Sequence, residues 1–438
     1  MNSIEIKFMK RIVLFFVLVL QFNLILIAKD PTSFEVLSKI SAIDSIKLIQ
    51  ETEYGSSIYM VWVTQFVDHD NPELGTFPQR VVYEHRSFDR PVVVVMEGYG
   101  IFSFRLSEPA KLLNANQITI EHRYFKKSRP NDSIPWSTLN IKNAAADQHK
   151  IIALFKPFYK SKWISTGISK GGQTAIFHRS FYPSDVDVSI PYVAPVNYSD
   201  IDERIFNFLD TVETELERLK IKNYQIELLK RKAKLMPKFK ELISEKGWNF
   251  SVSIDSVYDL AVFEFSFAYW QWGGKTEIPD LKSADTVLFE TLATSGAFQF
   301  FEEANVESNR PFFFQALTEI GMYGYKTEPF QEYTKLKGIL GFQFTLPFGY
   351  KQIKFNPQPM QEVDKWVKTQ GDNMLYIYGG QDAWSSTAAQ PGEQTNSRRF
   401  FNPGGNHATR IASFPKDMQD SIISILESWL ALEIERKP

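Results

Sequence analysis

The hydrophobic residues in the first half of the chain fall into short runs, and amphipathic stretches separate several of them. Runs rich in β-branched and aromatic residues predict two strands before residue 90. The next apolar runs are continuous, which is typical of strands buried on both faces of a parallel sheet. Stretches with apolar residues at helical spacing predict helices. The predicted strands are 56–67, 79–86, 91–100, 116–125, 162–167 and 187–195, and the predicted helices are 138–159 and 171–182.

The pattern changes near Asp200. Charged and then aromatic-rich helical stretches run from there to about Tyr325. Strand signals return at 373–380 and 398–405, and an amphipathic helix at 417–435 closes the chain. Strands that alternate with helices predict an α/β fold with a parallel sheet and helices on both faces, interrupted by a helical cap. The expected parts are a signal peptide at 1–28, a core at 29–199, a helical cap insertion at 200–345 and the second part of the core at 346–438.

The first 28 residues have the pattern of an export signal. Basic residues precede the apolar run Ile12–Ala28, and a polar segment follows it. Gln21 and Asn23 interrupt the run, which makes it marginal as a membrane span. We therefore expect cleavage after Ala28 and a secreted or periplasmic protein, with no membrane contact beyond this segment. An uncleaved anchor is the alternative, and it also leaves the catalytic part outside the cytoplasm.

Composition excludes several classes of function. The 438 residues include 49 basic and 51 acidic side chains, and this net charge of −2 does not favour nucleic acid or an anionic membrane as partner. The chain has no cysteine, so disulfides, a cysteine nucleophile and thiolate metal sites are excluded. It also has no H-E-x-x-H motif and no histidine pair at metal-ligand spacing. We therefore expect neither a metal nor another cofactor.

The stretch "WISTGISKGGQTA" carries the clearest chemical signal. Gly167, Ser169 and Gly171 fit G-x-S-x-G, with a predicted strand before them and a predicted helix after them. In that context the serine lies on a tight strand-to-helix turn, which exposes its hydroxyl and directs the N–H of Lys170 toward an oxyanion. A glycine-rich loop that packs a helix onto a strand is the alternative.

A serine nucleophile needs a base and an acid, which in this kind of fold follow in the order serine, acid, histidine. Of the histidines after Ser169, His407 lies in a glycine-rich loop between the last strand and the last helix. His178 falls on the helix behind the serine, where a surface or packing role is expected. Asp382 follows the preceding strand, whereas its rival Asp372 precedes that strand and so lies at the wrong end of the sheet.

The segment "VVVVMEGYG" offers the second oxyanion donor. In this architecture that donor comes from the loop after an earlier strand, so the backbone N–H of Gly98 or Tyr99 is the candidate. Glu97 in the same loop has two readings. It forms a salt bridge with a buried arginine such as Arg123, or it binds the amino group of a substrate.

Seven segments, in order along the chain, point to one family: "DHDNPELGTFPQR", "MEGYG", "IEHRYFKKSRP", "AAADQHKI", "WISTGISKGGQTA", "FYPSDVDVSIPYVAP" and "QALTEIGMYGY". Together they resemble the secreted prolyl tri/tetrapeptidyl aminopeptidases of bacteria, which are related to prolylcarboxypeptidase and dipeptidyl peptidase II. The resemblance runs from about Asp68 to Tyr325, and the Asp and His motifs extend it to Ala408. Gln173 departs from the pattern, because methionine is common at that position.

The resemblance implies an α/β-hydrolase domain with an inserted helical cap and a triad of Ser169, Asp382 and His407. It also implies peptide substrates with a free N-terminus, from which short peptides are released, often with proline before the cut. Glu97 and Glu319 are the candidates for binding the substrate amine. The aromatic segments 267–274 and 311–315 are candidate walls of a proline slot, with packing inside the cap as the alternative.

Three other functions remain open from the sequence. An esterase or lipase of the same fold would use the same triad without carboxylates directed at an amine. A dipeptidyl- or carboxypeptidase of the prolylcarboxypeptidase group would also keep the triad. A binding protein that had lost catalysis would not need all three triad residues in order, so their presence argues against it. The sequence carries no signal for an oligomeric state.

Overall fold

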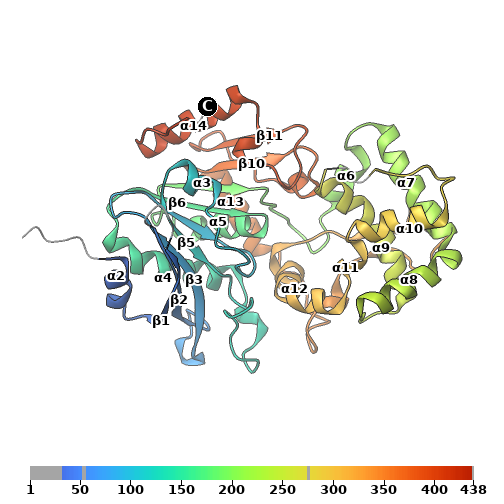
Figure 1. Ribbon diagram of the computed structural model, residues 1–438, viewed down its shortest axis with the longest axis horizontal. Helices are drawn as coiled ribbons and strands as arrows, with labels where there is room; N and C mark the ends of the chain where they lie inside the picture. The colour runs from blue at the N-terminus through green and yellow to red at the C-terminus, as the bar shows by residue number, and fades with distance from the viewer. Residues whose placement is uncertain (1–31, 52–55, 274–276, 437–438) are drawn as a thin grey trace, which may run out of the picture. The chain divides into compact units, whose positions relative to one another are not determined.

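The computed structural model describes residues 32–51, 56–273 and 277–436 (Figure 1). The described residues up to Ser41 belong to one compact unit and those from Ala42 onward to another. The first contains the helix α2 (Ser33–Lys39), whose start has a reciprocal capping box between Thr32 and Glu35. The expected signal peptide lies outside the described residues. Within the described segments, no helix combines the length and the hydropathy that a membrane span requires.

The second unit contains a sheet to which the described residues contribute nine strands, in the order β1-β2-β3-β5-β4-β6-β7-β10-β11. The pairs from β1 to β5 through β2 and β3 are antiparallel, and all pairs from β5 to β11 are parallel. The strands are β1 (Ile43–Glu51), β2 (Ser57–Phe66), β3 (Thr76–His85), β4 (Val92–Met96), β5 (Asn116–Ile120), β6 (Trp163–Ile168), β7 (Val188–Tyr192), β10 (Leu375–Gly379) and β11 (Arg398–Asn402). Every predicted strand is therefore confirmed, and β1 is an addition.

Helices cover both faces of this sheet, as the alternation of side chains along β10 shows. Leu375 packs into an apolar core with α14 (Lys416–Leu430), whereas the next residue, Tyr376, packs into a different core with α13 (Gln358–Thr369) and α5 (Lys170–Phe181). The first core also takes in α3 (Glu108–Leu112), and the second takes in α4 (Ile141–Phe155). The helices on both faces and the parallel part from β5 to β11 follow the prediction, whereas the antiparallel edge of β1, β2 and β3 makes the sheet mixed.

A helical insertion separates β7 from β10. Its helices are α6 (Glu203–Thr211), α7 (Glu215–Lys230), α8 (Lys232–Lys246), α9 (Ile254–Gln271), α10 (Asp285–Thr294), α11 (Ala297–Phe300) and α12 (Glu303–Gln315). A two-stranded ribbon of β8 (Tyr325–Lys326) and β9 (Ile339–Leu340) follows, which the sequence pattern did not predict. Both α6 and α9 contact the turn that follows β10, at Ala383–Thr387. The insertion therefore lies against the carboxyl end of the sheet.

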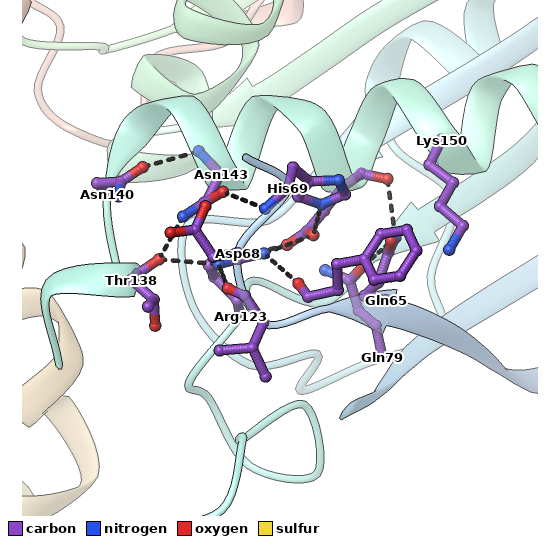
Figure 2. Close-up of polar contacts among 12 residues, drawn as sticks. Gln65, Asp68, His69, Gln79, Arg123, Thr138, Asn140, Asn143 and Lys150 are labelled. Atoms are coloured by element: carbon purple, nitrogen blue, oxygen red, sulfur yellow. Dashed lines mark hydrogen bonds and ion pairs between the residues drawn. The ribbon is translucent and has the colours of Figure 1, made fainter. Parts of the chain in front are cut away.

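A fully buried ion pair joins the strands to α4 (Figure 2). Arg123 follows β5 and donates from Nε and Nη2 to the two oxygens of Asp147, each at 2.7 Å. Its remaining N–H groups donate to the carbonyls of Phe66, Val67 and Thr138 at 2.8–3.1 Å. All five guanidinium donors are thus satisfied, which a charge in such a site requires.

This pair corrects one sequence expectation. Arg123 is bound by Asp147 and not by Glu97, so a salt bridge between Arg123 and Glu97 is excluded as the structural role of that carboxylate. Asp147 also accepts a contact from His69 Nε2 at 2.8 Å. The negative charge next to Arg123 thus comes from α4, and the sequence pattern did not identify Asp147 as this partner.

We expect Arg123→Met to lower the free energy of unfolding by about 3–5 kcal/mol, because it leaves the Asp147 carboxylate buried without its partner. Urea denaturation measures this loss. Lys142→Met is the matched control, since its ion pair with Asp70 is largely exposed and should contribute less than about 1 kcal/mol. Similar losses in the two variants would show that the buried pair has no special weight.

Candidate active site

Ser169 lies on a sharp turn between β6 and α5. Its φ of 57° and ψ of −124° place it in a region that a residue with a Cβ atom rarely adopts. Its N–H donates to the carbonyl of Tyr192 at 2.9 Å, and its own carbonyl accepts from Gln173, the fourth residue of α5, at 2.9 Å. A strained backbone of this kind costs about 1–3 kcal/mol and persists where the surroundings enforce it.

Close packing explains the glycines around this turn. A Cβ atom on Gly167 would lie 2.1 Å from the carbonyl oxygen of Gly171. A Cβ atom on Gly98, in the loop after β4, would lie 2.5 Å from the backbone nitrogen of Gly171. The loop after β4 therefore touches the backbone of the serine turn, as an oxyanion-binding loop must.

The acid and the histidine meet beside the sheet. Asp382 follows β10 and is fully buried, and its Oδ2 lies 2.8 Å from Nδ1 of His407, which follows β11. The Asp382 carboxylate also accepts from the N–H of Trp384 and from the hydroxyl of Ser385, both at 3.1 Å. These contacts fix the carboxylate and, through it, the ring of His407.

The rival residues lie elsewhere. Asp372 precedes β10 and accepts from the backbone N–H of Asn396 at 2.6 Å. His178 is fully buried on α5, with Nε2 at 2.9 Å from Asp185. Asp372 thus lies at the start of the strand whose end carries Asp382, and His178 has a packing role.

Ser169 and His407 reach the site from two sides. Among the described residues, no hydrogen bond joins Ser169 to His407. Burial raises the pKa of the Tyr99 phenol well above its usual range, and an interaction with Ser169 opposes this shift. The His407 ring packs edge-on against Trp272, with centroids 5.7 Å apart. Trp272 and Ser169 line the same cavity, so the ring of His407 lies directly behind one wall of the serine's cavity.

The loop after β4 is fastened by the side chain of Lys170. Its ammonium donates to the carbonyl of Gly98 at 2.8 Å. In a trans peptide the C=O and N–H groups point in opposite directions, so this bond also fixes the direction of the Tyr99 N–H. Burial lowers the pKa of Lys170 to about 7, and the nearby charge of Glu319 opposes that shift.

Neither carboxylate expected to bind an amine lines the cavity of Ser169. Glu319 accepts from Gln315 at 3.1 Å and interacts with Lys170, and burial raises its pKa to about 7. Burial and the charge of Glu121 raise the pKa of Glu97 to about 7. Glu97 and Glu319 therefore belong to the residues packed around the site and not to the wall of the cavity.

The cavity around Ser169 measures about 310 Å³, at the small end for a ligand pocket. Two aromatic segments singled out in the sequence contribute Phe267, Trp272 and Phe312 to its wall. Glu264 also lines it, and this residue is not among those predicted from the sequence. The available signal was one carboxylate inside the apolar run "AVFEFSFAYW". The remaining lining residues are Tyr99, Lys170, Gln173, Pro195, Asn197, Ala268, Gln271, Ser295, Gly296, Ala297, Phe300, Gly321, Met322, Tyr323 and Trp384.

A parallel sheet with a strained serine turn, and with an acid and a histidine after later strands, defines an α/β hydrolase with an inserted cap. The match to a family model specifies the class further. Residues 29–433 match the model described as PS-10 peptidase S37, and the chain belongs to this family of serine peptidases.

The chain is similar to two named peptidases. It is 31% identical over 411 residues to the prolyl tri/tetrapeptidyl aminopeptidase of Streptomyces mobaraensis, covering 90% of this chain and 85% of that protein. It is 26% identical over 186 residues to a probable serine protease of Arabidopsis thaliana, EDA2, covering 36% of this chain and 37% of that protein.

Among solved structures, the fold is similar to that of a proline iminopeptidase from Mycobacterium smegmatis. The sequence identity is 12% and the TM-score 0.41, over 88% of this chain and 99% of that one. It is also similar to VinJ, with 9% identity and a TM-score of 0.42 over 88% and 99% of the two chains. The assignment of the fold rests on the strand order and the serine turn described above.

We expect Gly98→Ala to lower kcat by about 10²- to 10³-fold, because the added methyl group displaces the loop from the serine turn and an oxyanion donor moves with it. Steady-state peptide hydrolysis measures this effect. Gly404→Ala is the control, since a Cβ atom there meets nothing within 4 Å. Wild-type turnover by the Gly98 variant would contradict the assigned place of this loop.

Proposed function

We propose that this chain is an exported aminopeptidase that releases tri- and tetrapeptides from the free N-terminus of peptides, with proline preferred before the scissile bond. One observation carries the proposal for the chemistry. Ser169 occupies a strained turn on a cavity that Trp272 also lines, and Trp272 packs against His407, the buried partner of Asp382. The similarity to the Streptomyces aminopeptidase supports the type of substrate.

In the proposed mechanism, Oγ of Ser169 attacks the carbonyl carbon before the scissile bond, and Nε2 of His407 takes the hydroxyl proton. Asp382 orients the ring through Nδ1 and stabilises the imidazolium that forms. The oxyanion binds the N–H of Lys170 and an N–H of Gly98 or Tyr99. His407 then protonates the leaving amine, and a water molecule activated by the same histidine releases the acyl group.

The small, aromatic-lined cavity supports a preference for short peptides. Aromatic rings from α9, α11 and α12 surround the serine together with Trp272 and Trp384. Such rings pack well against the compact apolar ring of proline. A cavity of about 310 Å³ fits a short extended peptide segment better than the surface of a folded protein.

Export is proposed from the basic and apolar pattern of residues 1–28. The proposed cleavage after Ala28 leaves the sequence matched by the family model, which starts at residue 29.

Ser169→Ala is expected to lower kcat by about 10⁴-fold or more, because it removes the attacking oxygen. The methyl side chain fits the same turn, so circular dichroism and the unfolding midpoint should match those of the wild type. Residual activity near the wild-type level in a folded variant would show that Ser169 is not the nucleophile.

A peptide panel tests the substrate. Peptides with free and acetylated N-termini, with proline or alanine before the cut, are incubated with enzyme that starts at Lys29, and products are read by mass spectrometry. We expect tri- and tetrapeptides from free N-termini, with proline preferred. Hydrolysis of a short-chain ester without peptide cleavage would move the function to the esterases. Equal rates on free and acetylated peptides would rule out an aminopeptidase.

A further inference from the structure

We propose that Glu264, supported by Tyr323 and Tyr325, binds the N-terminal ammonium group of the substrate. This inference rests on the proposed aminopeptidase function and assigns the subsite that such a function requires. The carboxylate is 4% exposed, lies on α9 in the middle of the cap and lines the cavity of Ser169. Of the described residues around that cavity, it is the one that carries a carboxylate.

The contacts of Glu264 leave it ready for a cation. Its Oε2 accepts hydrogen bonds from the phenol groups of Tyr323 at 2.9 Å and Tyr325 at 2.6 Å. Both bonds end on the same oxygen, so Oε1 remains as an acceptor outside this pair. Among the described residues, no lysine, arginine or histidine forms a salt bridge with it. A buried carboxylate is usually paired, so this arrangement is unusual in a folded interior.

The pKa of Glu264 is that of a buried carboxylate without a cationic partner. Burial raises the pKa of Glu264 to about 7, and the two tyrosine hydrogen bonds oppose this shift. A substrate ammonium next to the carboxylate would favour its charged form. Lys170, the cation on the same cavity, is already bound to the Gly98 carbonyl and interacts with Glu319. The cavity thus has an acceptor for a positive charge that no described side chain occupies.

The wall behind Glu264 explains why a peptide would end there. The ring of Phe267 stacks on Tyr323 with centroids 3.7 Å apart and planes 5° apart. A second cavity of about 360 Å³ lies in the cap, and Phe267 and Tyr325 line it while Phe267 also lines the cavity of Ser169. The stacked rings therefore separate the two spaces, and in the proposed binding mode the released peptide extends from Glu264 to Ser169.

Glu264→Gln tests the assignment, because it keeps the shape and removes the charge. The probes are Ala-Ala-Pro p-nitroanilide with a free and with an acetylated N-terminus, and kcat/KM is measured for both. We expect kcat/KM for the free peptide to fall by about 30-fold or more. For the acetylated peptide it should stay within about twofold. Glu290→Gln, an exposed residue of α10, is the control and should match the wild type on both probes.

Tyr325→Phe keeps the test decisive if the glutamine variant does not fold. It removes one donor to Glu264 and should raise KM for the free peptide alone. An equal loss on both probes, or none, in these variants overturns the assignment. So does a selective loss on the free peptide in Glu97→Gln or Glu319→Gln with none in Glu264→Gln. A wild-type enzyme that does not distinguish the two probes would instead refute the aminopeptidase function itself.

Discussion

The buried guanidinium of Arg123 is the constraint on which the site geometry depends. A charge without solvent needs an acceptor for every N–H, and these acceptors come from the end of β2, from the segment before α4 and from α4 itself. Glu121 and His122, just before Arg123, connect this buried network to the loop after β4. Glu121 accepts from the N–H of Ile101 at 2.9 Å, and the N–H of His122 donates to the carbonyl of Tyr99 at 3.1 Å. The loop that faces Ser169 is thus held at Tyr99 and at Ile101.

The sequence predicts the features that depend on local pattern. The central strands are buried on both faces, so their apolar runs are continuous and their positions follow directly. Glycines mark the turn at Ser169, because the backbone segments approach so closely there that a Cβ atom does not fit. Chain order then selects His407 and Asp382, because the carboxyl ends of parallel strands share one edge. In the structure, Nδ1 of His407 lies 2.8 Å from Oδ2 of Asp382.

What the sequence does not predict depends on contacts between distant segments. The strand β1 has a partly exposed face without regular alternation, so its pattern carries little signal. The partner of Arg123 is Asp147, on a helix 24 residues away, and not Glu97. Glu264 lies within an apolar helix, and the two tyrosines that donate to it come 59 and 61 residues later in the chain. No local rule connects such residues.

The positive φ of Ser169 sets folding and chemistry against each other at one position. Glycine adopts this backbone conformation without steric cost, whereas serine and alanine are both strained in it. The residue best suited to the turn is therefore one that has no oxygen with which to react. Under the proposed mechanism, selection for stability alone would replace the serine by glycine and remove the nucleophile. The glycines on either side leave the space that this disfavoured backbone conformation of Ser169 requires.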